Sequence, residues 1–112
     1  MPIQASEPTS VVPLRDDDIE TVVATGGVAL VEFYAEWCGA CQRMAPALDA
    51  VATDTDATVV TVDVETHLET AIEFGAQRAP TVVLFVDGDP VKHLRGAQDE
   101  QTLRDLVARY SD

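Results

Sequence analysis

Positive charge is scarce in this sequence. Seven Lys and Arg residues stand against 20 Asp and Glu, the formal net charge is −13, and Lys92 is the single lysine. A surface of this sign repels the phosphates of nucleic acids and anionic lipid headgroups. We therefore expect neither nucleic-acid binding nor membrane binding.

The acidity has two explanations. Many acidic residues, little lysine and many small residues suit a halophilic protein, because concentrated salt screens self-repulsion while the net charge maintains solubility. An ordinary acidic cytosolic protein has a similar balance of charges. Both interpretations fit the composition.

Long apolar runs are lacking as well. No stretch is long and apolar enough to cross a bilayer, and residues 1–9 contain neither the basic nor the apolar region of a signal peptide. We expect a cytoplasmic protein with a flexible N-terminal tail over residues 1–9 and one domain over residues 10–112. In a reducing compartment, cysteines indicate catalysis or metal binding more than a structural disulfide.

Cysteine is rare too, and its placement is informative. The chain has two cysteines, Cys38 and Cys41, separated by two residues. They follow the apolar run 28–34, which we expect to be a central strand covered on both faces, and they open a segment with helical periodicity. A thiol at a helix start meets unpaired N–H groups and the positive end of the dipole, so its pKa falls. Cys38 is thus the expected nucleophile, and Cys41, one turn behind and within disulfide reach, would resolve the mixed disulfide. The small residues between them, Gly39 and Ala40, should leave Cys38 open to an incoming protein.

A structural zinc site is disfavoured, because it needs four ligands. The sequence offers two thiols and two histidines, His67 and His93, with no second pair at ligand spacing. We expect no metal and no cofactor, and we expect both histidines to lie on the surface without partners.

Strands and helices alternate along the chain, which predicts an α/β fold. We expect strands at 11–12, 28–34, 58–64 and 81–86, then a hairpin through 87–90 into a strand at 91–94. Helices are expected over about 16–25, 38–52 and 67–74, and after the N-cap Asp99, with a kink at Pro46. The alternating strands should pair in parallel, and the hairpin should add an antiparallel pair.

The segment from Ala35 to Cys41, Ala-Glu-Trp-Cys-Gly-Ala-Cys, resembles the active-site loop of the thioredoxin family. The likeness continues at Pro46, Asp63, Ala79-Pro80-Thr81, Phe85, Gly88 and Gly96. The resemblance implies a thioredoxin fold, a central mixed five-stranded β-sheet flanked by four α-helices. It also implies a monomeric protein-disulfide oxidoreductase that reduces client proteins by dithiol/disulfide exchange and is itself reduced by a thioredoxin reductase.

The resemblance also assigns roles around the Cys38–Cys41 disulfide. Pro80 would be a cis proline beside it, and the backbone of Ala79 would pair with a substrate segment as a short added strand. The remaining residues would line a shallow apolar docking groove: Trp37, Gly39, Ala40, Gly96 and Ala97.

Glu32 interrupts the apolar strand shortly before the cysteines. Burial should raise the pKa of its carboxyl, which would suit it to exchange a proton with Cys41 near neutral pH; the alternative is a surface acid without a role. The family usually has Asp here, a lysine where this chain has Thr61, and a proline at Ala40. The last difference leaves the reduction potential open.

Two rival functions stay open. A disulfide oxidase or isomerase could use the same fold in the opposite direction, although Trp37 and the expected location disfavour it. A non-catalytic adaptor could also use the fold, but it would not need both Cys38 and Cys41.

Overall fold

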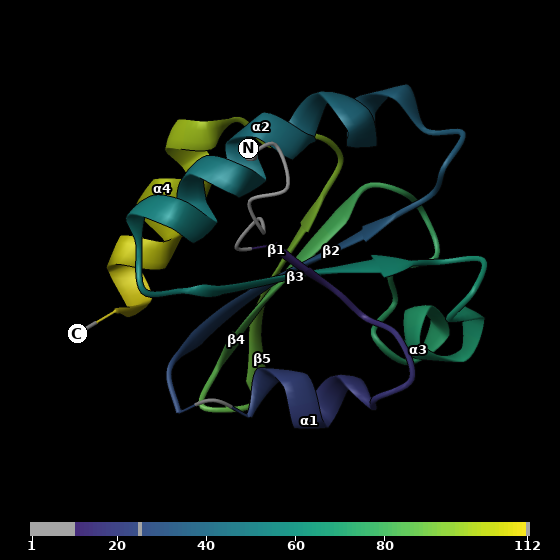
Figure 1. The fold of residues 1–112 in the computed structure, drawn as a ribbon, viewed down its shortest axis with the longest axis horizontal. Coiled ribbons are helices and arrows are strands. Elements are labelled where there is room, and N and C mark those ends of the chain that lie inside the picture. Colours follow the sequence, from purple (N-terminus) through teal and green to yellow (C-terminus); the bar gives the residue numbers. More distant parts are fainter. Residues whose placement is uncertain (1–10, 25, 112) are drawn as a thin grey trace, which may run out of the picture.

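The computed structural model describes residues 11–24 and 26–111 (Figure 1). The expected tail over residues 1–9, and the expected end of the first helix at Thr25, lie outside the described residues. The elements along the chain are β1 (Val11–Pro13), α1 (Ile19–Val23), β2 (Val28–Tyr34), α2 (Gly39–Asp54), β3 (Thr58–Asp63), α3 (Leu68–Glu73), β4 (Thr81–Val86), β5 (Asp89–Arg95) and α4 (Glu100–Tyr110). The predicted order of strands and helices is confirmed.

The five strands form one mixed sheet in the order β1-β3-β2-β4-β5. β3 pairs in parallel with β1 and β2, whereas β4 runs antiparallel to β2 and to β5. The expectation of parallel pairing is therefore wrong for β4. The six residues of α3 rise roughly 9 Å, too little to return along the sheet, so β4 starts at the end where β3 finishes.

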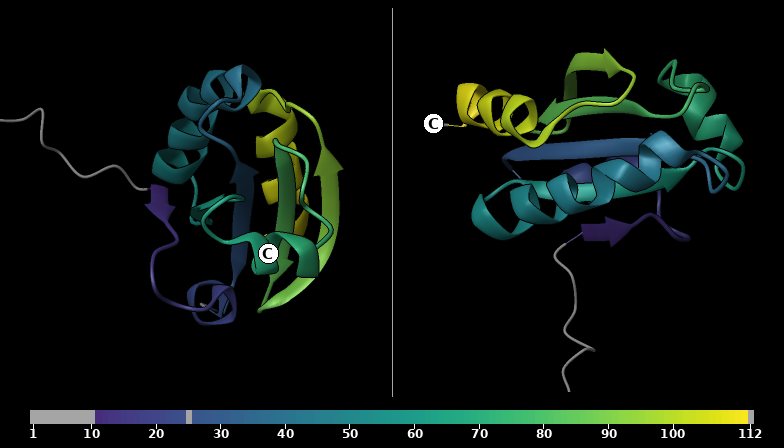
Figure 2. Two further views of the ribbon diagram at one scale, coloured as in Figure 1. Left: turned by 90° about the vertical axis from the view of Figure 1, so that its right-hand side faces the viewer. Right: turned by 90° about the horizontal axis from the view of Figure 1, so that it is seen from above.

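Helices cover both faces of the sheet (Figures 1 and 2). On β2, Ala29, Val31 and Phe33 belong to the core under α1 and α3. Val28 and Leu30 belong to the core under α2 and α4, which lie side by side. Glu32 has the parity of Leu30, which places its side chain on the α2 face.

The element boundaries differ in detail from the sequence expectations. α1 begins at Ile19 after an N-cap Asp18 whose side chain makes no capping hydrogen bond, so Asp16 and Asp17 precede the helix rather than open it. Asp side chains compete with helical backbone bonds, which favours this late start. At α4 the predicted cap is confirmed: Asp99 Oδ1 accepts from the Thr102 N–H at 2.8 Å. α2 continues to Asp54 with Pro46 inside it, and the kink there stays a prediction.

The predicted hairpin between β4 and β5 is confirmed, with a tighter turn. Asp87 and Gly88 have φ values of 52° and 88°, the left-handed pair of a two-residue turn. β5 therefore starts at Asp89, two residues earlier than expected. Both sheet edges contain proline, Pro13 in β1 and Pro90 in β5. No helix within the described residues is long and apolar enough to cross a membrane.

Candidate active site

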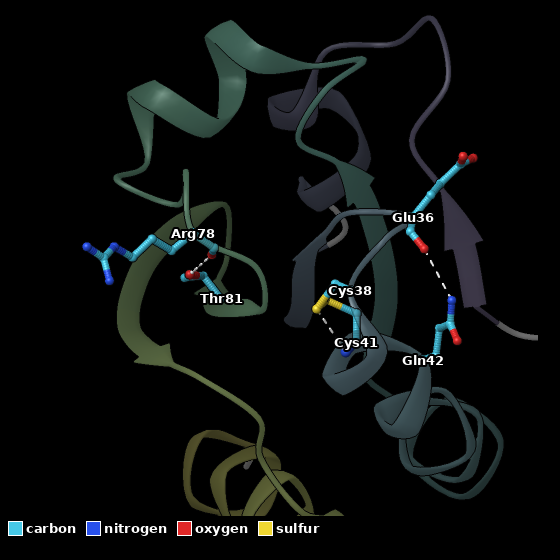
Figure 3. Close-up of a disulfide and its surroundings, with 6 residues drawn as sticks. All are labelled: Glu36, Cys38, Cys41, Gln42, Arg78 and Thr81. Atoms are coloured by element: carbon cyan, nitrogen blue, oxygen red, sulfur yellow. Dashed lines mark hydrogen bonds between the residues drawn. A yellow bond between two sulfur atoms is a disulfide. The ribbon is translucent and has the colours of Figure 1, made fainter.

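The two cysteines form a disulfide at the N-terminus of α2 (Figure 3). Cys38 is the N-cap residue, its Cα lies 5.3 Å from that of Cys41, and its Sγ accepts from the Cys41 N–H at 3.1 Å. The prediction that the pair lies within disulfide reach is confirmed. Because helix N–H groups and the dipole both face Cys38, they stabilise negative charge on this sulfur once the bond is reduced.

The cysteines are less accessible than the sequence suggested. Cys38 is 7% exposed and Cys41 5%, so the expectation that Gly39 and Ala40 leave Cys38 open is wrong for this disulfide form. Both cysteines belong to the core cluster that contains Ala35, with Ala40 and Ala79 packed against it. Because these small side chains pack closely around it, only a small part of Cys38 is accessible to solvent.

A cis peptide bond joins Ala79 to Pro80, as the resemblance implied. Pro80 is buried, its carbonyl accepts from the Gly96 N–H at 2.9 Å, and Thr81 Oγ1 donates to the Arg78 carbonyl at 2.6 Å (Figure 3). Ala79 lies outside helices and strands and makes no backbone hydrogen bond within residues 11–24 and 26–111. Its N–H and carbonyl are therefore available to a partner strand.

Trp37 lies on the surface immediately before Cys38. Its side chain is 71% exposed, and its Nε1–H donates to Glu65 Oε2 at 3.3 Å. Glu65 follows β3, and its backbone N–H donates to Asp63 Oδ1 at 2.8 Å. Sequence analysis missed Glu65, because an acid after a strand carries no local signal of a partner 28 residues away.

Glu32 is buried on the α2 face of the sheet. It is 3% exposed, and no group of the described residues hydrogen-bonds its Oε2. Burial raises the pKa of this carboxyl to about 7, as expected for a desolvated acid.

Glu32 and Cys41 share a cavity of about 400 Å³ between α2, the sheet and the loop before Cys38. The other lining residues are mostly apolar or small, with two acids and one amide among them: Val11, Tyr34, Ala35, Glu36, Gln42, Ala45, Leu48, Asp49 and Thr61. The cavity connects the buried carboxyl with the second cysteine, which is the pairing that the sequence predicted for proton exchange.

The remaining predicted site residues are Gly39, Ala40, Gly96 and Ala97. Gly39, Gly96 and Ala97 are exposed and Ala40 is half-buried, while the Gly96–Pro80 hydrogen bond brings the end of β5 to the cis proline. An apolar docking groove over these residues and Trp37 stays a prediction.

In the part of the chain that the structure describes, no three His, Cys, Asp or Glu residues cluster in a way that could hold a metal ion. The histidines do have partners, contrary to expectation. The Nε2 atoms of His67 and His93 lie 3.2 Å and 3.1 Å from the carbonyl oxygens of Leu14 and Phe74. Both histidines thus bind backbone of neighbouring segments, which the sequence pattern did not reveal.

Comparison with known proteins identifies close relatives of this arrangement. The family model described as Thioredoxin matches residues 10–109. A thioredoxin of Mycobacterium tuberculosis is 41% identical over 101 residues, covering 88% of this chain and 87% of the relative. A thioredoxin of Staphylococcus saprophyticus is 36% identical over 97 residues, covering 85% and 88%. Among solved structures, a point mutant of thioredoxin from Halobacterium salinarum NRC-1 superposes with a TM-score of 0.88 at 35% identity over 96% of both chains.

Proposed function

This chain belongs to the thioredoxin family and is a protein-disulfide oxidoreductase, and from that premise we propose that Cys38, Cys41 and Glu32 carry out its exchange chemistry. The observation that carries the proposal is the Cys38–Cys41 disulfide at the N-terminus of α2, beside the cavity that Glu32 shares with Cys41.

In the first step, the thiolate of reduced Cys38 attacks one sulfur of a client disulfide. A bond forms between Cys38 Sγ and that sulfur, the client S–S bond breaks, and the second client sulfur leaves as a thiolate. The position of Cys38 at the helix N-cap supports this role, because a sulfur there is ionised more readily.

In the second step, Cys41 resolves the mixed disulfide. The Glu32 carboxylate takes the thiol proton of Cys41, whose sulfur then attacks Cys38 Sγ and releases the remaining client thiolate. The client gains two electrons, and the Cys38–Cys41 disulfide is restored. The pKa of Glu32, raised to about 7, supports this role, because a base with a pKa near the working pH transfers protons efficiently.

Client binding involves the surface around the cis proline. An extended client segment pairs with the free N–H and carbonyl of Ala79, as a strand added over the cis Pro80. Trp37, Gly39, Ala40, Gly96 and Ala97 contribute the surrounding apolar contacts. The large exposed fraction of Trp37 supports its part in docking.

A thioredoxin reductase would return the two electrons, and the protein would work as a cytoplasmic monomer. We further propose adaptation to concentrated salt. The net charge of −13 and the similarity to a thioredoxin from Halobacterium salinarum support this.

Insulin reduction tests the mechanism. The reduced protein should cleave insulin disulfides, Cys38→Ser should abolish turnover, and Cys41→Ser should accumulate a mixed disulfide that a gel without reductant detects. Turnover retained by Cys38→Ser would refute the proposal. Equilibration of the wild-type dithiol with glutathione then separates a reductant from the rival oxidase or isomerase, since a reductant holds the more negative potential.

A further inference from the structure

Three of the seven basic residues of this acidic chain belong to segments that border the redox disulfide. We call Arg43 of α2, Arg78 before the cis peptide bond and Arg95 at the end of β5 the arginine triad. All three are exposed. They come from three separate segments, so the fold rather than a sequence motif brings them together.

Arg43 lies against the start of α2. One of its guanidinium nitrogens, Nη1, is 3.5 Å from the position that a Cβ on Gly39 would occupy. Gly39 directly follows Cys38, so this cation lies beside the residue next to the nucleophile. Arg43 therefore adds a positive charge on the α2 side of the site.

Arg78 and Arg95 border the cis-proline segment. Arg78 immediately precedes Ala79, which packs against the core cluster that contains both cysteines. Arg95 pairs with Thr81 in the β4–β5 register, and the N–H of the next residue, Gly96, donates to the Pro80 carbonyl. The Gln98 side chain donates to the Arg95 and Gly96 carbonyls at 3.3 and 3.2 Å, which fixes this turn.

The triad is free of internal partners. Within the described residues, the side chains of Arg43, Arg78 and Arg95 make no ion pair or hydrogen bond, whereas Arg104 binds both Asp54 and Glu100. Arg15, Lys92 and Arg109 also lack an ion pair within the described residues, so the triad is distinguished by its position beside the site.

The acids near the site do not neutralise the triad. Glu65 accepts from Trp37, and Glu36 extends from the other side of the disulfide than Arg78 does (Figure 3). Glu69 and Glu73 on α3 are exposed and form no ion pair with Arg78. None of these acids forms an ion pair with an arginine of the triad within the described residues, so the triad keeps its positive charge beside the site.

We propose that the arginine triad selects client disulfides with acidic flanking residues, by binding carboxylates of the client segment that pairs with Ala79. This inference rests on the proposed function and adds a substrate class to it. The net charge of −13 would otherwise repel such clients, and guanidinium groups bind carboxylates in a bidentate fashion. Complementary charge at the rim determines which partner docks and how fast.

Disulfide-linked peptides with the same core and flanks of Asp/Glu, Ser or Lys/Arg provide the test, with kcat/KM as the readout. The wild type should prefer the acidic flank, and each of R43Q, R78Q and R95Q should lower the acidic-to-basic ratio roughly two- to fivefold, the range of an exposed ion pair. The acidic-to-basic ratio of kcat/KM isolates client selection, because a variant that changes the reactivity of the Cys38 thiolate alters the rates with all peptides equally. The preference should also shrink in molar KCl, where charges are screened.

Arg109→Gln is the matched control. Its neighbour Tyr110 lies with Gly27 and Val28 at the start of β2, whereas Cys38 follows the end of that strand. This control should keep the wild-type ratio. If the wild type reduces all peptides at equal rates, or if the triad variants lose activity equally on all of them, this inference is overturned and the proposed function still stands. A wild type inactive on every peptide would overturn the proposed function and this inference with it.

Discussion

Glu32 and Thr61 are register partners on the parallel strands β2 and β3, and both line the cavity that Cys41 also lines. The other ionisable groups lining this cavity are Tyr34, Glu36 and Asp49, none of which is a cation at neutral pH. The pKa of Glu32 is therefore raised by burial with no positive charge from the cavity walls to oppose it.

Thr61→Lys should place an ammonium group beside Glu32 and lower the pKa of its carboxyl. The pH midpoint for release of the mixed disulfide should then move to lower pH, because the carboxylate form becomes available earlier. Stopped-flow measurement of release between pH 5 and 9 checks this. Thr61→Met, long but neutral, should leave the midpoint in place; an equal shift in both variants would rule out a charge effect.

Glu32→Gln should stabilise the fold at neutral and higher pH. The folded-state pKa of about 7 lies above the ordinary value of 4.5, so the native state binds the proton more tightly and stability falls as pH rises between these values. Above pH 7 the full cost is roughly 3 kcal/mol, which the amide does not incur. Urea unfolding should give similar free energies for both proteins near pH 4.5 and diverging ones by pH 8. A constant difference across this range would contradict the burial argument.

Glu65→Ala should loosen Trp37 by removing the acceptor of its indole N–H. Because Trp37 is the only tryptophan, its fluorescence maximum and anisotropy report this directly. The KM for insulin should rise about two- to fivefold, the worth of one hydrogen bond at an exposed site. Glu69→Ala, on exposed α3, is the control and should change neither quantity. Unchanged fluorescence in Glu65→Ala would mean that the hydrogen bond does not hold the indole.

Molar KCl should raise the melting temperature steeply. With a net charge of −13, screening removes self-repulsion in the compact state, and the Debye length falls to about 3 Å at 1 M salt. Thermal unfolding followed by circular dichroism from 0.05 to 3 M KCl measures the effect. A flat or falling melting temperature would favour an ordinary acidic protein over a salt-adapted one.

Local signals in the sequence predicted much of the fold and of the site. Strand 28–34, the Asp99 cap and the paired cysteines each depend on residues a few positions apart, and the structure confirms them. The direction of β4 was missed because it depends on how short α3 is, and apolar spacing does not fix the ends of a helix. The exposure of Cys38 was also misjudged, because Ala79 packs on the cysteine cluster from a distant segment.

The functional residues that sequence reasoning missed share one property. Glu65 and the arginine triad act through contacts between segments far apart in the chain, and none of them belongs to a recognisable motif. The sequence gives the type of each residue, but their positions near the active site depend on the packing of α2, the cis-proline loop and β5.

The proline in each edge strand of the sheet affects the tendency of the protein to aggregate. Pro13 in β1 and Pro90 in β5 lack the N–H that an incoming strand would need, and β5 also carries Lys92 and a register irregularity opposite Leu84 and Phe85. Both edges are thereby protected against runaway edge-to-edge aggregation. A client strand can therefore pair with the free backbone of Ala79, while the two edge strands of the sheet do not template the addition of further chains.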